Sequence, residues 1–186
     1  MSLRRLPTEL DELVLIEPTV HGDERGFFVE TYRASALHAL GITDAFVQDN
    51  HSRSQRGVIR GMHFQVDPPA AKLVRCARGA IVDVLVDIRP GSDAYGTWEA
   101  FDLSDENGHI LFAPAGFAHG FAVLSDVADV LYKQSAEWSA RADRGFTPED
   151  PEVGIAWPVA PADRVLSERD RTAPRLADVE ALLSPG

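Results

Sequence analysis

"KLVRCARGAIVDVLVDI", Lys72–Ile88, contains two runs rich in valine, leucine and isoleucine, joined by the short turn signal "ARG". Both runs have the length and the β-branched content that are typical of strands. Side chains alternate between the two faces of a strand, so Ile81, Asp83, Leu85 and Asp87 share one face and Val82, Val84, Val86 and Ile88 the other. The stretch therefore predicts two successive strands, with the Asp83 carboxylate between apolar side chains.

Short runs of the same kind recur along the chain, between turn signals such as "HGDERG", "SQRG", "DPPA", "PGSDAYG", "SDENG" and "APAG". The runs are "LVLIEPTV", "FFVETY", "VIRGMHF", "TWEAFDL", "HILFAPA", "GFAVL" and "DVLYKQS". Many short strands at this spacing favour an antiparallel sandwich or barrel over alternating strand and helix units. Helices are expected only at "RASALHALG" (33–41) and "LADVEALL" (176–183), and the proline-rich segment 148–165 is expected to wrap the barrel as an extended arm.

The composition limits the functional classes. With 186 residues, 45% of them hydrophobic, we expect a single domain over residues 1–186. No window has the roughly 20 apolar residues of a membrane helix, and the N-terminus lacks the apolar core of a secretory signal, so the expected location is cytoplasmic. A net charge of −11 argues against a nucleic-acid partner, and a lone cysteine, Cys76, excludes an internal disulfide framework.

The buried carboxylate needs a partner, because an unpaired charge in a core costs several kcal/mol, on the order of 3–5. Lys72 shares a face of the preceding strand with Val74 and Cys76, which makes it the predicted partner of Asp83 across the "ARG" turn. The pair is either part of a functional site or a purely supporting ion pair.

A histidine stands inside the strand of "RGVIRGMHFQ" (56–65). Strict alternation puts His63 on the face of Ile59, Gly61 and Gln65, and sends Arg60 to the opposite face. A bulge at Gly61 would instead bring Arg60 and His63 to one pocket, since isolated glycines in strands often mark bulges.

A second histidine, His119 of "PAGFAHGF", shares its predicted strand face with Phe117, Phe121 and Val123. Taken singly, a strand histidine is more often a satisfied structural residue than a catalyst. Two histidines on separate strands of a small barrel, beside the strand residues Lys72, Asp83 and Tyr132, predict a functional site.

Small cupin-type barrels often hold a metal through a His-x-His pair, a carboxylate and a later histidine. Here the pair reads His63-Phe64-Gln65, and Lys72 stands where the carboxylate would follow. We therefore expect no metal and no cofactor. The remaining base, cation and phenol suit proton abstraction beside a carbonyl, which requires a base, a donor for the enolate oxygen and an acid.

Several motifs in order resemble the dTDP-4-dehydrorhamnose 3,5-epimerase family: "DERGFFVETY", "QDNHSRSQRGVIRGMHFQ", "KLVRCARGAIVDVLVDIRPGS", "PAGFAHGFAVLS", "LYK" and "LSERD". The match runs in register from about Ile16 to Pro174. The resemblance implies an all-β, cupin-type jelly-roll barrel or sandwich that acts as a metal-independent isomerase in deoxysugar biosynthesis. It also implies a dTDP-4-keto-6-deoxyhexose substrate, with C3 and C5 beside the ketone, and a homodimer in which an N-terminal strand crosses to the partner.

The resemblance implies a role for each site residue. His63 is the base, held and polarised by Asp170, and Tyr132 is the acid on the opposite face of the sugar. Lys72 stabilises the enolate oxygen, and Asp83 and His119 complete the pocket. The nucleotide is held by residues matching Arg25, Glu30, Gln48, Asn50 and Arg60, with Asp143 and Arg169 near it.

Three residues depart from the family pattern: Arg169 replaces a lysine, Asp143 a glutamate, and Trp138 a tyrosine that lines the sugar pocket. They leave open whether one or both carbons are inverted, since relatives in antibiotic-sugar pathways invert only one. Two other functional hypotheses stay open: a metal-dependent cupin oxygenase or isomerase, and a non-catalytic protein that binds a sugar nucleotide.

Overall fold

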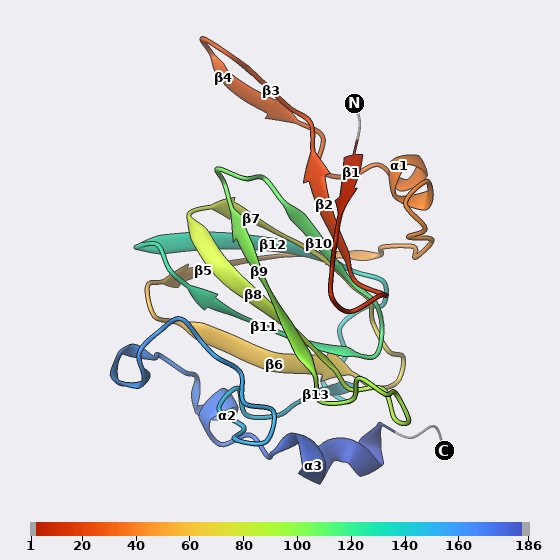
Figure 1. Ribbon diagram of the computed structural model, residues 1–186, viewed down its shortest axis with the longest axis vertical. Coiled ribbons are helices and arrows are strands. Elements are labelled where there is room, and N and C mark those ends of the chain that lie inside the picture. The colour runs from red at the N-terminus through yellow and green to blue at the C-terminus, as the bar shows by residue number, and fades with distance from the viewer. Residues whose placement is uncertain (1–2, 184–186) are drawn as a thin grey trace.

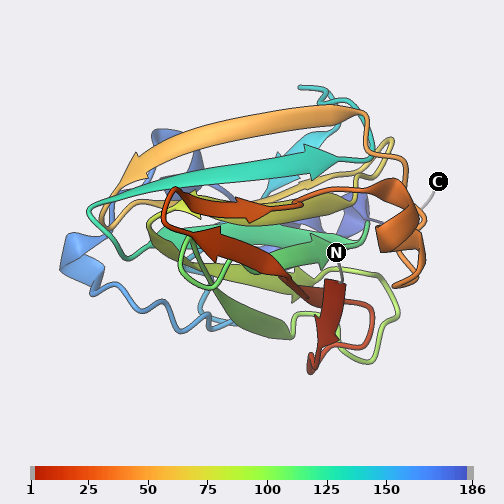
Figure 2. The same ribbon diagram turned by 90° about the horizontal axis from the view of Figure 1, so that it is seen from above.

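The computed structural model describes residues 3–183, and two antiparallel sheets form the body of the molecule (Figures 1 and 2). The six-stranded sheet has the order β1 (Leu3–Leu6), β2 (Val14–Pro18), β10 (Ile110–Ala113), β7 (Lys72–Arg78), β12 (Val127–Gln134) and β5 (Gln48–Gln55). The five-stranded sheet has the order β13 (Asp143–Gly145), β6 (Ile59–Gln65), β11 (Phe117–Val123), β8 (Ala80–Asp87) and β9 (Trp98–Ser104). Sequence neighbours are seldom sheet neighbours, as in a jelly roll, so the predicted fold class is confirmed.

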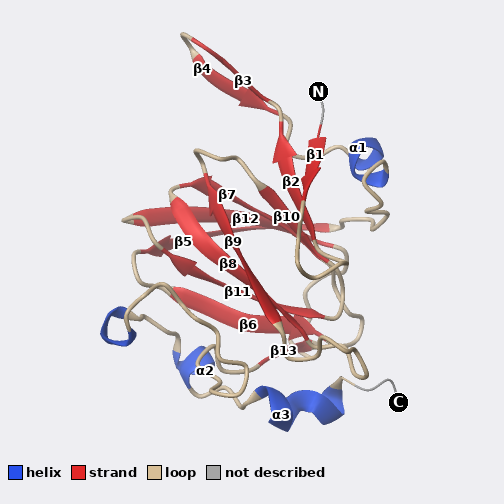
Figure 3. Ribbon diagram, in the orientation of Figure 1, coloured by secondary structure: helices blue, strands red, loops and turns tan. Residues whose placement is uncertain are grey.

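The remaining elements are short (Figure 3). A hairpin of β3 (Val20–Asp23) and β4 (Gly26–Val29) projects from the body. The helices are α1 (Ala34–His38), α2 (Glu168–Arg171) and α3 (Leu176–Val179), with 3₁₀ turns η1 (Pro161–Asp163) and η2 (Glu180–Leu182). Both predicted helical segments contain helix, although each is shorter than expected. No helix within residues 3–183 is long and apolar enough to cross a membrane.

The strand alternation predicted for 80–88 is confirmed by the core. Ile81 and Leu85 lie in the apolar cluster between the two sheets, whereas Val84 and Val86 lie in a second cluster on the outer face of the five-stranded sheet. The proline-rich segment covers this outer face, with Trp157 buried and its indole N–H donating to the Pro148 carbonyl at 2.7 Å. It therefore acts as the predicted arm.

Strand β5 was not predicted, because "QDNHSRSQ" contains no apolar residue. It lies at the edge of the six-stranded sheet and pairs with β12 along its whole length, from Gln48↔Gln134 to Gln55↔Val127. Pairing with an apolar neighbour, rather than its own composition, makes this segment a strand. The short strands β1 and β13 and helix α2 were also not predicted.

The predicted bulge at Gly61 is present. His63 pairs with His119 and Arg60 with Phe121, so β6 has one residue more than β11 between these pairs. Gly61 has a φ of 118°, and a Cβ there would lie 2.6 Å from Cα of Gly120. The extra residue places Arg60 and His63 on the same side of β6.

The bulge also corrects one expectation. Ile59 does not share a face with His63: it packs in the outer cluster with Met62, while His63 faces the space between the sheets.

Candidate active site

A cavity of about 230 Å³ opens between the two sheets. The five-stranded sheet contributes Arg60 and His63 from β6 and His119 from β11, and the six-stranded sheet contributes Lys72 from β7 and Tyr132 from β12. The other predicted residues that line the cavity are Trp138, Asp143 and Arg169. Residues from segments far apart in the sequence, at 60–72, 119–143 and 169, therefore meet in one place.

His63 and Asp170 form a close pair, with 2.7 Å between Nε2 and Oδ1. Asp170 lies in α2, whose first turn is capped by Ser167: its Oγ accepts from the Asp170 backbone N–H at 3.1 Å. Burial by itself would raise the pKa of Asp170, but hydrogen bonds from His63, Ser167 and the Gly61 backbone bring that pKa below its usual value. The ionised carboxylate fixes one ring nitrogen, so the other can accept a proton.

The direct partner of Asp83 is His119, with 2.8 Å between Oδ2 and Nε2, and not Lys72 as predicted. The reason is topological, because the "ARG" turn connects β7 in one sheet to β8 in the other, where β8 pairs with β11. Asp83 is fully buried and His119 nearly so. Burial lowers the pKa of His119 in spite of the nearby carboxylate.

Lys72 is buried at the start of β7, and its Nζ donates to the His63 carbonyl oxygen at 3.2 Å. Burial lowers the pKa of Lys72 to about 8, against the attraction of Asp83 and Asp143. The ammonium group is therefore a titratable cation beside His63, at the wall of the cavity.

Tyr132 lies on the opposite wall from His63, since β12 and β6 belong to different sheets. Its ring centroid is 6.5 Å from that of His119. Burial, and then the charge of Asp143, raise the pKa of the Tyr132 phenol above its ordinary value. The phenol stays protonated at neutral pH and can act as a proton donor.

Arg169, Asp143 and Trp138, the three residues expected to depart from the pattern of the resembled family, form one connected group. Arg169 Nη1 contacts Asp143 Oδ2 at 2.7 Å. Burial alone would raise the pKa of Asp143, but hydrogen bonds from Arg169 and from the Trp138 side chain lower it. The Trp138 side chain, at the same cavity, is largely exposed.

Gln65, which replaces the second histidine of a metal pair, is engaged with two loops. Its Nε2 lies 3.4 Å from the carbonyl oxygens of Pro68 and Glu137, and its Oε1 accepts from Ser139 N at 3.0 Å. The amide thus holds the segment that carries Trp138. Within the described part of the chain, no three side chains of His, Cys, Asp or Glu are grouped so as to hold a metal ion.

The neighbouring edge strand supplies a row of neutral polar groups. Gln48 Nε2 donates to Asn50 Oδ1 at 2.8 Å, Gln48 Oε1 accepts from Trp138 N at 2.6 Å, and Asn50 pairs in register with Tyr132. Arg60 Nε donates to Ser54 Oγ at 2.9 Å. Gln48 and Asn50 therefore adjoin residues that line the cavity without lining it themselves.

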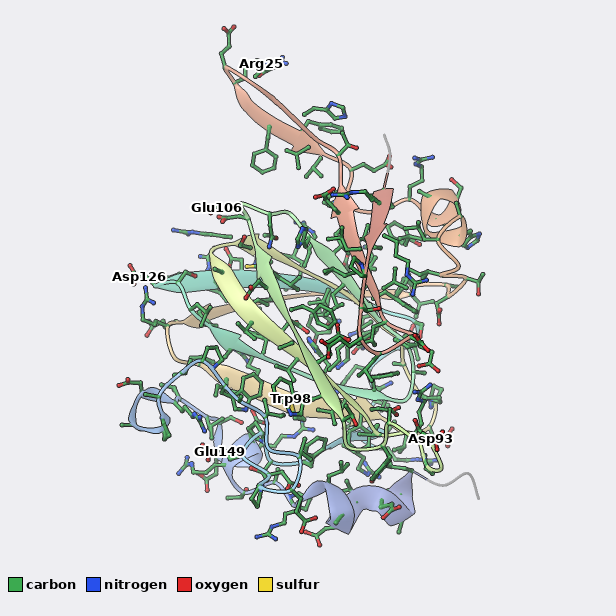
Figure 4. The ribbon with its side chains drawn as sticks, in the orientation of Figure 1. Arg25, Asp93, Trp98, Glu106, Asp126 and Glu149 are labelled. Carbon is green, nitrogen blue, oxygen red and sulfur yellow. The ribbon has the colours of Figure 1, made fainter. Side chains whose placement is uncertain are left out.

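Two predicted residues lie elsewhere in their own chain. Arg25 is at the tip of the β3–β4 hairpin, far from the body, and forms an ion pair with Asp23 (Figure 4). Glu30 follows β4 and pairs with Arg33 at 2.9 Å. Neither lines the cavity.

Five lining residues were not predicted: Ser52, Phe64, Gln65, Phe121 and Gln134. Ser52 was missed because β5 was not recognised as a strand. Alternation along "DVLYKQ" puts Gln134 on the face of Tyr132, a signal that would have identified it.

The chain is similar to proteins of one family over most of its length. The sequence model of the dTDP-4-dehydrorhamnose 3,5-epimerase family matches residues 7–178. Proteins named dTDP-4-dehydrorhamnose 3,5-epimerase from Methanothermobacter thermautotrophicus and Pseudomonas aeruginosa are 48% and 46% identical, over 91% and 92% of this chain and 92% and 94% of theirs.

Solved structures are also similar. A dTDP-6-deoxy-D-glucose-3,5-epimerase from Legionella pneumophila, in complex with dTDP-4-keto-L-rhamnose, has a TM-score of 0.94 and 44% identity, over 98% of this chain and 97% of that one. A 3'-monoepimerase from Streptomyces bikiniensis, in complex with dTDP-quinovose, has a TM-score of 0.88 and 35% identity, over 96% and 91%.

Proposed function

Since the chain belongs to the dTDP-4-dehydrorhamnose 3,5-epimerase family and is an isomerase of dTDP-linked deoxysugars, we propose that it inverts both C3 and C5 of a dTDP-4-keto-6-deoxyhexose. The observation that carries this proposal is the His63–Asp170 pair, at 2.7 Å, on the wall opposite Tyr132 in one cavity. An epimerase removes a proton from one face of the sugar and delivers another from the opposite face.

Epimerisation needs a base, an acid and a group that stabilises the enolate, and the cavity contains one residue suited to each role. A hydrogen beside a ketone becomes acidic when the resulting enolate is stabilised, and Lys72 supplies a cation next to the base. His63, with one ring nitrogen held by Asp170, removes the proton. Tyr132, whose phenol keeps its proton at neutral pH, returns one from the other side.

The nucleotide half of the substrate needs local cations, because the chain carries a net charge of −11. Arg60 and Arg169 both line the cavity. The planar guanidinium of arginine binds diphosphate oxygens through two parallel hydrogen bonds. Gln48 and Asn50, on the adjoining strand, offer neutral partners for the rest of the nucleotide.

The projecting hairpin supports a homodimer. Phe27 and Phe28 are 68% and 59% exposed in the single chain, an unfavourable position for two adjacent aromatic side chains. We propose that the hairpin docks on a second copy, where Arg25 from its tip reaches the partner's cavity. This arrangement accounts for a substrate-binding arginine that lies away from its own cavity.

The test is to incubate the protein with dTDP-4-keto-6-deoxyglucose in heavy water and to follow the sugar by NMR. We expect deuterium at C3 and at C5, with both centres inverted. His63→Ala should reduce exchange by roughly 10²–10⁴-fold while dTDP affinity is retained, and Asp170→Asn should also slow it. His38→Ala, at an exposed histidine of α1, is the matched control and should leave the rate unchanged.

Other outcomes would identify other functions. Deuterium at one carbon only would indicate a mono-epimerase, and binding of the sugar nucleotide without any exchange would indicate a non-catalytic binder. Full activity of His63→Ala would remove that residue from the mechanism.

A further inference from the structure

Gln134, the last residue of β12, has a buried amide nitrogen without a hydrogen-bond partner among the described residues. The residue is 4% exposed and lines the cavity, and its Nε2 has no hydrogen-bond partner among residues 3–183. Leaving a buried donor unpaired is destabilising, and native proteins seldom keep such groups without a reason. An amide at a cavity wall is satisfied when a ligand supplies an acceptor.

Neighbouring glutamines behave differently. Gln65 and Gln48 use both ends of their amides on loops and side chains that shape the cavity. Ser52 Oγ and Asn50 Nδ2 are also buried without a hydrogen-bond partner in the part of the chain that the structure describes. All three belong to the β5 and β12 strands of the six-stranded sheet, and Gln134 and Ser52 also line the cavity that holds the two histidines. This wall presents donors that the protein itself leaves unused.

The strand register places Gln134 next to the chemistry. Gln134 pairs with Lys72 on the antiparallel neighbour β7, and side chains paired in this way have Cβ atoms roughly 4.5–5.5 Å apart. Lys72 in turn bonds the backbone of His63, the proposed base. The Gln134 amide thus reaches the region of the cavity where the hexose, and not the nucleotide, undergoes reaction.

We propose that Gln134 is a specificity-determining residue whose Nε2 donates a hydrogen bond to a hexose oxygen beside the one that Lys72 contacts. The inference rests on the proposed function, because it takes its orientation of the sugar from the role of Lys72. A neutral amide distinguishes a hexose that carries an oxygen at this position from one that lacks it, since the unmatched donor would remain buried without a partner.

Two substitutions at one site test the proposal. Gln134→Met keeps the length of the side chain and removes the donor, whereas Gln134→Glu keeps the shape and replaces the donor by an acceptor. Gln55→Met, at an exposed glutamine of β5, is the matched control. We measure kcat/KM for dTDP-4-keto-6-deoxyglucose and, by calorimetry, the affinities for dTDP-glucose and for dTDP.

Gln134→Met should lower both kcat/KM and dTDP-glucose affinity by about tenfold, the effect of one hydrogen bond, with dTDP affinity unchanged. Gln134→Glu should lower both kcat/KM and the affinity for dTDP-glucose by more than Gln134→Met does. The melting temperature of Gln134→Met should stay the same or rise, because an unpaired buried donor has been removed. Gln55→Met should match the wild type throughout.

An unchanged affinity of Gln134→Met for dTDP-glucose would overturn the proposal, as would an equal loss of dTDP affinity, which would mean a distorted cavity. The calorimetric comparison does not require turnover. If the wild type showed no exchange, the proposed function would fail, while the ratio of dTDP-glucose to dTDP affinities would still decide the role of Gln134.

Discussion

The pH dependence of catalysis should report on Lys72. Burial lowers the pKa of this group from 10.5 to about 8. If the ammonium form stabilises the enolate oxygen, activity is present below the pKa and is lost as the pH rises through it. By the titration equation, about nine-tenths of Lys72 is charged at pH 7 and about one-tenth at pH 9. We therefore expect kcat/KM to fall about tenfold per pH unit above 8, since this parameter reports the free enzyme.

Unfolding does not account for such a loss. The pKa of Lys72 is lower in the folded protein than in the unfolded chain, so the unfolded chain binds more protons between pH 8 and 10.5. The contribution of Lys72 to the free energy of unfolding therefore rises with pH across that window. Tyr132 stays protonated over most of the range, because burial raises the pKa of its phenol. The fall of kcat/KM at alkaline pH is then assigned to deprotonation of Lys72.

The assay is the initial rate of epimerisation from pH 6 to 9.5, with far-UV circular dichroism at each pH to confirm that the protein is folded. Lys72→Gln should be slow and should lack the alkaline limb, since no group at this position titrates. Lys133→Gln, at the second lysine of the chain, should keep it. A flat wild-type profile between pH 7 and 9.5, or an unchanged limb in Lys72→Gln, would refute the assigned role.

Three further predictions concern the acid, the bulge and the metal. Tyr132→Phe should keep hydrogen exchange and largely lose inversion, especially at C5, as seen by NMR in heavy water; unchanged inversion would mean that another group is the acid. Gly61→Ala should lower the free energy of unfolding by more than about 2 kcal/mol in urea titrations, because the added Cβ would lie 2.6 Å from Cα of Gly120. Gly91→Ala is the control: Gly91 has a φ of 79° but open space around its Cβ position, so the free energy of unfolding should fall by less. Activity should survive exhaustive chelation, since Gln65 is bonded to loop backbone and Lys72 is a cation; loss on chelation, restored by one metal, would favour a metal-dependent enzyme.

Much of the fold could be predicted from local patterns. Alternation in Ala80–Ile88 assigned the apolar side chains to the correct faces, and the glycine inside "VIRGMHF" indicated the bulge that brings Arg60 and His63 to the same side of the strand. Strand β5 could not be found in this way, because its eight polar residues form a strand only through pairing with β12.

Part of the site was likewise beyond local reasoning. The partner of Asp83 depended on whether the "ARG" turn joins neighbouring strands or crosses between sheets, and it crosses. Gln134 belonged to a predicted strand, but no local pattern indicates that its Nε2 is buried next to Lys72 and lacks a partner within residues 3–183.

The sequence by itself determined most of the apolar strands, which of their faces are buried and which chemical groups are available, because these follow from the period of the backbone and from side-chain type. The tertiary structure alone decided that His119 holds Asp83 and that Arg25 lies outside its own cavity. It also brings Asp170 to His63 across 107 positions of the chain, a pair that only the family resemblance, and no local pattern, had implied. The physical reason is that contacts between sheets are set by strand order and packing, which join segments that no local pattern relates.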